Sequence, residues 1–254
     1  MPLENCPKCN GVGWIIVTQE EVSGAQRCDC EAESRAAGLE EKASLPPLYR
    51  NASLDNFILP RDNMIAHREL ATVLLEIKSF VREFPNEKRP GLLLTGEPGT
   101  GKTHLAVAAL RMLMARGFAG LFWDYQTLLD TIRGSYDPAA GASNKQAYQQ
   151  ALDAEILLLD DLGAQRVTDW ALDTVTSIIT HRCNFRKPLI ATTNMPDPEA
   201  GGTTRRNALT NQPEYRETLS DRVGARARSR LFEMCRVVKM PLVEDYRLRP
   251  SPRT

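Results

Sequence analysis

The residues with the clearest chemistry lie between positions 96 and 103, where the chain reads Gly-Glu-Pro-Gly-Thr-Gly-Lys-Thr. This stretch fits the phosphate-loop pattern G-x-x-x-x-G-K-[ST] at every fixed position. Its three glycines allow the backbone to turn tightly and to direct N–H groups at phosphate oxygens. We expect Lys102 to reach the β- and γ-phosphates of a nucleoside triphosphate, and the Thr103 hydroxyl to bind Mg²⁺.

The residues on either side predict the strand and helix that such a loop requires. Leu92 to Leu94 predict a short buried strand, and residues 105–113 predict a helix whose first turn offers unpaired N–H groups and a positive dipole end. A chance glycine-rich turn before a helix is the alternative, and it does not explain a complete motif. The expected nucleotide contacts are Gly96, Glu97, Pro98, Gly99, Thr100, Gly101, Lys102, Thr103 and His104.

A second chemical motif follows more than fifty residues later. Residues 156–159 are aliphatic and run directly into Asp160 and Asp161. This pattern predicts a buried parallel strand with carboxylates at its C-terminal edge, where parallel α/β sheets bind their ligands. We expect Asp160 to hold Mg²⁺ through water, and Asp161 to orient or deprotonate the attacking water. An aliphatic run that ends in aspartates is weak evidence alone, and the phosphate loop before it strengthens it.

The next predicted strand, residues 187–194, ends in a polar residue, Asn194. In a parallel sheet the amide of Asn194 would lie beside the γ-phosphate and the attacking water. The alternative is an asparagine that caps a turn before Pro196. The other two motifs favour the catalytic role.

Four of the six cysteines, Cys6, Cys9, Cys28 and Cys30, stand within the first thirty residues. A C-x-x-C turn, a hairpin-sized gap and a closing C-x-C pair suit four thiolates around tetrahedral Zn²⁺, although C-x-C is tighter than the usual spacing. Disulfides, which are rare in cytosolic proteins, and simple reduced thiols are the alternatives. So small a module buries little core, so a bound metal would have to hold it together.

Composition and charge narrow the class of protein. The chain has 254 residues, is 42% hydrophobic and 25% charged, and has no apolar run near the roughly 20 residues of a membrane span. The N-terminus does not resemble a secretory signal, so we expect a cytoplasmic protein without a membrane partner. Residues 1–45 carry eight acidic against four basic side chains, and residues 205–254 carry twelve basic against six acidic. These ends are candidate regions for contacting a protein and for contacting phosphate or another subunit, respectively.

Periodicity predicts the elements that position these groups. Further predicted elements are a polar helix or linker over 31–45, a long amphipathic helix over 63–84, a strand over 121–124, helices over 125–133, 144–153, 168–182 and 219–234, and a strand over 237–240. Residues 196–216 predict a long polar loop, in which Arg205 and Arg206 either contact nucleic acid or are solvated. The last helix carries Arg222, Arg226, Arg228 and Arg230, and arginine is the residue type that contacts phosphate from a neighbouring subunit.

This ordered set of motifs resembles the DnaC/IstB family of AAA+ ATPases, a bacterial group of helicase loaders and transposition helpers. The resemblance covers roughly residues 46–248 and rests on residues 96–103, Leu157–Gly163 with Thr168-Asp169-Trp170, Ala191–Asn194 and Ser229–Cys235. The cysteine turn more loosely resembles the zinc-bearing N-terminal part of some helicase loaders. We therefore expect a four-cysteine zinc module with a linker helix over residues 1–45 and an AAA+ ATPase domain over residues 46–254.

The resemblance implies an α/β P-loop NTPase fold with a five-stranded parallel sheet and ATP bound between subunits. Arg230 matches the family's arginine finger, which reaches a neighbour's ATP, and Arg226 is a second candidate. Tyr49 and Arg50 belong to a segment, residues 48–51, that matches the one packed near adenine.

The predicted broken helix over residues 125–148 takes the place of the insertion that faces DNA in this group. Its Arg133, Tyr136 and Lys145 are candidate contacts to the backbone or bases of single-stranded DNA. Two features depart from the family pattern. Asp160-Asp161 replaces the more frequent Asp-Glu, which predicts slow hydrolysis. There is also no sizeable C-terminal lid or helix-turn-helix, so a DnaA-type initiator is disfavoured and no sensor-2 arginine can be assigned.

The favoured function is an ATP-dependent replication protein that loads the replicative DNA helicase onto single-stranded DNA. It would act as a homo-oligomer in its ATP-bound state, and its acidic zinc module would bind the helicase. An IstB-like helper of a transposase has the same core motifs, and the zinc module favours the loader. A nucleotide-gated adaptor with little turnover is the third possibility. The expected cofactors are ATP, Mg²⁺ and Zn²⁺.

Overall fold

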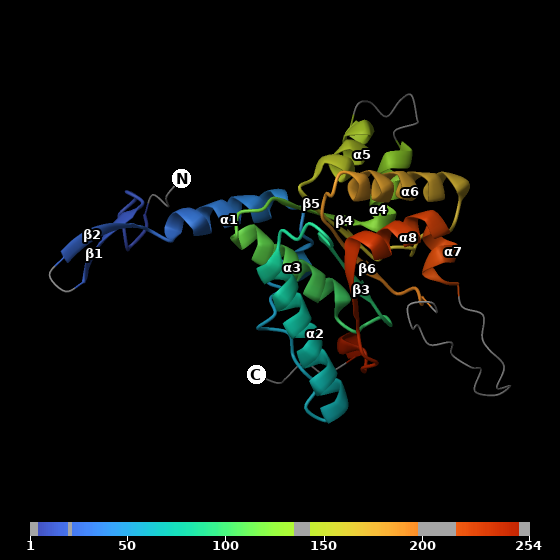
Figure 1. Cartoon of the computed structure of the whole chain (residues 1–254), viewed down its shortest axis with the longest axis horizontal. Coiled ribbons are helices and arrows are strands. Elements are labelled where there is room, and N and C mark those ends of the chain that lie inside the picture. Colours follow the sequence, from blue (N-terminus) through green and yellow to red (C-terminus); the bar gives the residue numbers. More distant parts are fainter. Residues whose placement is uncertain (1–4, 20–21, 135–142, 198–216, 249–254) are drawn as a thin grey trace.

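A five-stranded parallel sheet with the strand order β4-β5-β6-β3-β7 lies at the centre of the protein (Figure 1). The computed structural model describes residues 5–19, 22–134, 143–197 and 217–248. The strands are β3 (Gly91–Thr95), β4 (Gly120–Asp124), β5 (Ile156–Asp160), β6 (Leu189–Thr193) and β7 (Cys235–Lys239). Each neighbouring pair runs parallel, which confirms the predicted α/β fold class.

Helices cover both faces of this sheet. One face carries α1 (Cys30–Lys42), α2 (Met64–Glu83) and α3 (Lys102–Ala115), and the other carries α4 (Tyr125–Arg133), α5 (Ser143–Asp153), α6 (Asp169–Asn184), α7 (Leu219–Val223) and α8 (Ala225–Met234). Strand β3 shows why two layers form. Leu92 and Leu94 pack in the first core and Leu93 in the second, and none of the three is exposed to solvent. A central parallel strand needs apolar side chains on both sides.

Polar side chains mark where several helices begin. Asn63 and Thr168 accept hydrogen bonds from Ala66 N–H and Ala171 N–H, and so cap α2 and α6 near the predicted starts. Asp124, the last residue of β4, accepts from Thr127 N–H at 2.7 Å and caps α4. These caps explain why the chain passes from strand or loop to helix at these positions.

The predicted single helix over residues 219–234 was wrong. The structure has two helices, α7 and α8, which meet at Gly224. Gly224 has φ 84° and ψ 147°, a conformation that glycine adopts without strain and that interrupts the hydrogen bonding of a helix. The break turns the arginines of α7 and α8 in different directions.

A hairpin of β1 (Trp14–Gln19) and β2 (Val22–Arg27) lies at the far end of α1 from the sheet (Figure 1). The other end of α1 is fixed to the core. Phe122 N–H in edge strand β4 donates to the Ala43 carbonyl at 2.8 Å, and Arg111 of α3 forms an ion pair with Glu40 at 3.0 Å. A short 3₁₀ turn, η1 (Pro47–Tyr49), follows. The proposed domain boundary at residue 45 stays a prediction.

Candidate functional site

The glycine-rich loop joins the end of β3 to the start of α3. Gly96, Gly99 and Gly101 all have positive φ, at 153°, 76° and 89°. Gly101 is the N-cap of α3 and has no side chain with which to cap it, so the first N–H groups of the helix stay available to an anion. The loop therefore has the backbone that a phosphate cradle requires.

Lys102, the first residue of α3, is the charged group of this cradle. Its side chain is 5% exposed, and its Nζ donates to the Glu97 carbonyl at 2.7 Å. Burial lowers the pKa of Lys102 to about 8, against the opposing effect of the nearby carboxylates of Asp161 and Asp160. This desolvated ammonium lies between the loop and the two carboxylates, where phosphate oxygens would replace its carbonyl contact.

Asp160 and Asp161 follow β5 at the same edge of the sheet. Thr192 Oγ1 donates to Asp160 Oδ1 at 2.6 Å and accepts from Asp161 N–H at 2.9 Å, so the end of β6 orders both acids. Burial raises the pKa of Asp160, although hydrogen bonds from Thr192 and Thr103 act in the opposite direction. Asp161 has φ 57°, which turns the chain away from the strand direction.

Asn194 lies within hydrogen-bonding distance of the second acid. Its Nδ2 donates to Asp161 Oδ1, so the two side chains predicted to handle water contact each other. The structure thus brings together Lys102, Thr103, Asp160, Asp161 and Asn194 at the carboxyl ends of β3, β5 and β6. Their catalytic roles stay predictions.

The donors at this edge suit Mg²⁺. The Thr103 hydroxyl lies close enough to the Asp160 carboxylate to act on its pKa, and both groups supply hard oxygen atoms. Mg²⁺ keeps several water ligands when it binds nucleotides, so one or two protein oxygens are enough. The residues present therefore fit the metal that the phosphate loop implies.

The residues expected to contact the adenine of ATP or to flank the loop lie on two sides of the loop. Burial and the nearby charge of Asp160 raise the pKa of Tyr49, so its phenol lies near the acids at the end of β5. His104 Nε2 lies 2.9 Å from the Ser53 carbonyl, and its ring packs on Phe57 at 5.6 Å. Arg50 is exposed. No described contact ties Arg50 to the loop.

A C-terminal segment, which the sequence motifs did not predict at this site, crosses the loop. Tyr246 N–H donates to the Gly99 carbonyl at 3.0 Å, and the carboxyl carbon of Asp245 lies 2.0 Å from where a Cβ on Gly99 would be. The charge of Arg247 acts on the pKa of both Lys102 and Tyr49. No periodicity marks residues 245–247, and their only sequence signal is three polar side chains after an apolar strand.

A cavity of about 590 Å³ adjoins the loop on the side of β7. It is lined by Gly96 and Glu97 of the loop, by Asn194 and by residues of α2 and α8. The cavity therefore opens beside the predicted site for the γ-phosphate.

The four arginines predicted to share one helix point to different partners. Arg222 donates to the Gln165 carbonyl at 3.0 Å, and Arg228 forms a bidentate pair with Asp197, both bonds 2.8 Å long. Arg230 donates to Glu233 at 2.7 Å and lies beside Cys183, close to where α6 ends before β6. Arg226 is exposed, and no described side chain pairs with it.

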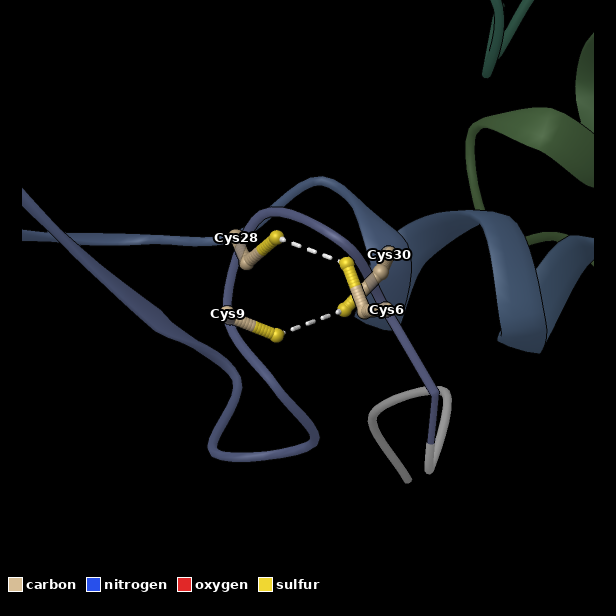
Figure 2. A group of neighbouring side chains, drawn as sticks. All are labelled: Cys6, Cys9, Cys28 and Cys30. Carbon is tan, nitrogen blue, oxygen red and sulfur yellow. Dashed lines mark hydrogen bonds between the residues drawn. The ribbon is translucent and has the colours of Figure 1, made fainter.

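The four N-terminal cysteines converge on one centre (Figure 2). The Cys6 and Cys28 sulfurs are 3.7 Å apart, and the Cys9 and Cys30 sulfurs are 3.5 Å apart. A tetrahedral zinc–thiolate centre with Zn–S near 2.3 Å has sulfur–sulfur edges of about 3.8 Å. All four cysteines are free and buried, so this geometry fits a metal and not a pair of disulfides.

The N–H groups around the cluster suit thiolates. Desolvation opposes ionisation of Cys9, but hydrogen bonds from Gly13, the neighbouring thiols and Gly11 prevail and lower its pKa to about 7. The described residues hold no other group of three or more candidate ligands this close together.

The residues predicted to contact DNA are only partly described. The Arg133 guanidinium lies over the Trp170 ring, 5.0 Å from its centre. Lys145 belongs to α5, but its side chain lies outside the described part of the chain, as do Tyr136, Arg205 and Arg206. Among the described helices, none is long and apolar enough to cross a bilayer.

Comparisons with known proteins agree with this geometry. A family model described as IstB-like ATP binding protein matches residues 41–212. The replicative helicase loader DnaC of Escherichia coli (strain K12) is 22% identical over 183 residues, which are 71% of each protein. A crystal structure of the DnaC helicase loader is 31% identical, has a TM-score of 0.59 and covers 77% of this chain and 100% of that one.

A DnaI crystal structure shows the same fold, with a TM-score of 0.54 at 20% identity, over 81% of this chain and 97% of that one. The family match covers well over half of the sequence and includes the loop, both acids and Asn194. The chain therefore belongs to the DnaC/IstB-like family of AAA+ ATPases.

Proposed function

We propose that this chain is an ATP-dependent replication protein that loads the replicative DNA helicase onto single-stranded DNA. The proposal rests on five side chains that meet at one edge of the sheet, those of Lys102, Thr103, Asp160, Asp161 and Asn194. The chain that brings them together also spans the whole of a DnaC helicase loader structure. The oxygens of a bound triphosphate would accept hydrogen bonds from the N–H groups of the loop and from the Lys102 ammonium.

One chain would supply the residues that hold Mg²⁺ and the attacking water. Thr103 and Asp160 would hold Mg²⁺, which when bound offsets the negative charge on the phosphate oxygens. Asp161 would orient the attacking water and accept its proton, and the Asn194 amide fixes the carboxylate for that task. Because Asp161 has a shorter side chain than glutamate, we expect slow turnover. We also expect DNA to stimulate this turnover.

A second subunit would complete the site. Arg226 is exposed near the start of α8, whereas Arg230 already pairs with Glu233 and lies beside Cys183 near the opposite edge of the sheet. Arg226 is therefore the better candidate for a guanidinium that reaches a neighbour's γ-phosphate. ATP binding would then favour the homo-oligomer, and hydrolysis would release it.

The cysteine cluster would serve partner binding. Bound Zn²⁺ would hold a small module that lies at the far end of α1 from the sheet (Figure 1). Residues 1–45 carry an acidic excess, which suits a basic surface on a partner protein. We assign this module to the helicase and the ATPase domain to ATP and single-stranded DNA.

The test is capture of partners by the immobilised full-length chain, with and without ATP. We expect the replicative helicase of the source organism to be retained, with Lys102→Ala losing the effect of ATP. The family model carries the name of IstB, so a transposase helper is the second candidate function. Retention of a transposase and not of the helicase would replace our first choice by this one.

A nucleotide-gated adaptor is distinguished by turnover. If the wild-type protein binds ATP and a partner but shows no DNA-stimulated ATPase activity, the chain is an adaptor and the loader mechanism given above is wrong.

A further inference from the structure

The chain segment after β7 packs directly against the glycines of the phosphate loop. A Cβ atom on Gly96 would lie 2.7 Å from the Cβ of Met240, and one on Gly99 would lie 2.0 Å from the carboxyl carbon of Asp245. Real Cβ atoms essentially never come within 3.0 Å of another heavy atom, so this segment leaves no room for a side chain at either position. The motif explains these glycines by the approach of phosphate, and the structure adds the approach of this segment as a second reason.

Tyr246 joins this segment to the loop and to the chain that precedes α2. Its N–H donates to the Gly99 carbonyl at 3.0 Å, and its phenol donates to the Ile58 carbonyl at 2.7 Å. Its ring packs on the ring of Phe57, with the two centres 5.2 Å apart. The Phe57 ring in turn lies 2.5 Å from where a Cβ on Gly101 would be. Tyr246 therefore acts on the loop directly at Gly99 and through Phe57 at Gly101.

The segment that carries this tyrosine is fixed at both ends. At its start, Met240 N–H donates to the Thr95 carbonyl at 2.7 Å, where β3 enters the loop. At its end, the N–H and the Nε of Arg247 donate to Asp245 Oδ1 at 2.9 and 3.1 Å, and so close a tight turn. The tyrosine is therefore held in place by the sheet on one side and by this turn on the other.

We propose that Tyr246 is a positioning residue for nucleotide binding, which holds the phosphate loop in its binding conformation before a nucleotide arrives. The inference rests on the proposed function, because it requires the loop to bind a nucleotide. Glycine has more backbone freedom than any other residue, so a loop with three glycines loses much conformational entropy when it is ordered. A loop that is ordered beforehand loses less on binding, and its affinity for the ligand is higher.

The test measures ATP hydrolysis and the binding of a fluorescent, non-hydrolysable ATP analogue by the full-length protein. Tyr246→Phe loses the hydrogen bond to Ile58, and we expect it to raise both the Kd of the analogue and the KM for ATP about fivefold. The kcat should stay within about twofold, because the loop holds the ground state and the transition state alike. Tyr148→Phe is the matched control, because its phenol pairs with Ser177 at 2.7 Å between α5 and α6. That variant should behave as wild type.

Two further variants isolate the backbone contact with Gly99. Tyr246→Ala removes the side chain beyond Cβ, and Tyr246→Pro also removes the N–H that donates to the Gly99 carbonyl. Tyr246 is the first residue of a 3₁₀ turn, η4 (Tyr246–Leu248), and a first helical position tolerates proline. We expect Tyr246→Pro to bind the analogue about fivefold more weakly than Tyr246→Ala.

A tyrosine that only stabilises the fold gives a different result. Partial unfolding would lower kcat in proportion to the fraction of active protein and leave KM unchanged. That result in Tyr246→Phe, a wild-type Kd and KM in the same variant, or equal affinities of the alanine and proline variants would overturn the inference and leave the proposed function intact. If the wild-type protein binds no ATP analogue, the proposed function itself fails.

Discussion

Lys102 has a charge that depends on pH within the physiological range. Burial lowers its pKa from 10.5 to about 8, so the ammonium loses its proton as the pH rises from 7 to 9. We predict that ATP affinity falls over that interval, because the neutral amine no longer attracts phosphate. Titrations with a fluorescent, non-hydrolysable ATP analogue at pH 7, 8 and 9 measure this, and Lys102→Arg, whose guanidinium stays charged over this range, should not show the fall. A flat profile in the wild type would contradict the burial of a charged Lys102.

The same shift predicts how stability depends on pH. Between pH 8 and 10.5 the unfolded chain keeps the Lys102 proton that the folded chain has lost. The unfolded state therefore binds more protons there, and the contribution of Lys102 to the free energy of unfolding rises with pH in that window.

A substitution at Asp161 should affect ATP turnover without affecting ATP binding. We predict that Asp161→Asn keeps ATP affinity within about twofold and lowers kcat roughly 10²- to 10⁴-fold, the usual contribution of a general base. Asn194→Asp would place two carboxylates at the contact that Asn194 Nδ2 now makes. Stopped-flow binding and steady-state turnover check both variants. Equal turnover in Asp161→Asn and wild type would remove Asp161 from the mechanism.

At the scale of residues, the sequence was most informative where the chemistry of a site dictates both residue types and their spacing. The spacing of Gly96, Gly101 and Lys102 predicts a phosphate-binding loop, and in the structure both glycines have positive φ and α3 begins at Lys102. Asp245 and Arg247 could not be found in this way. Their proximity to the loop depends on how the chain turns after β7, and no local pattern encodes that turn.

At the scale of elements, Arg182 of α6 fixes two neighbouring turns to the sheet. It is completely buried and donates to the carbonyls of Ala151, Leu152, Ala154, Glu155 and Pro188. We predict that Arg182→Met lowers the free energy of unfolding by about 3 kcal/mol, because several buried carbonyls lose their donor. Arg166→Met, at an exposed position, should change it by less than about 0.5 kcal/mol. Urea denaturation measures both, and equal stabilities would contradict this role.

The position of Arg182 also shows a limit of sequence reasoning. Its helix was predicted from apolar spacing, but an arginine between hydrophobic positions gives no sign that it is buried. Gly224 shows the same limit, because a glycine within a helical pattern is usually tolerated, at a cost of about 1 kcal/mol. After the break, α7 packs against the turn after β5, where Arg222 lies against Gly163, and this tertiary contact has no signature in the local sequence. Strands were easier to predict, because β3 and β5 need side chains that are buried on both faces.

At the scale of the whole molecule, the cysteine cluster lies at the start of α1, and the candidate ATP site lies at the start of α3 and the carboxyl ends of β3, β5 and β6. We predict one zinc ion per chain, and we predict that chelation unfolds residues 5–27 while ATP binding persists. Metal analysis and analogue binding before and after chelation measure these outcomes. Cys9→Ser should lose the zinc, whereas Cys183→Ser, outside the cluster, should keep it. Purified protein without zinc, or ATP binding that is lost on chelation, would contradict this division.

The central claim is that one subunit binds ATP and that an arginine of the next subunit completes the ATP site. Mixing two inactive variants tests it most directly. Lys102→Ala cannot bind ATP but keeps Arg226, and Arg226→Ala binds ATP but lacks the arginine. We predict that each variant alone is nearly inactive as an ATPase and that an equimolar mixture regains a substantial fraction of wild-type activity. A mixture no more active than its components, or an Arg226→Ala protein with wild-type activity by itself, would contradict the shared site.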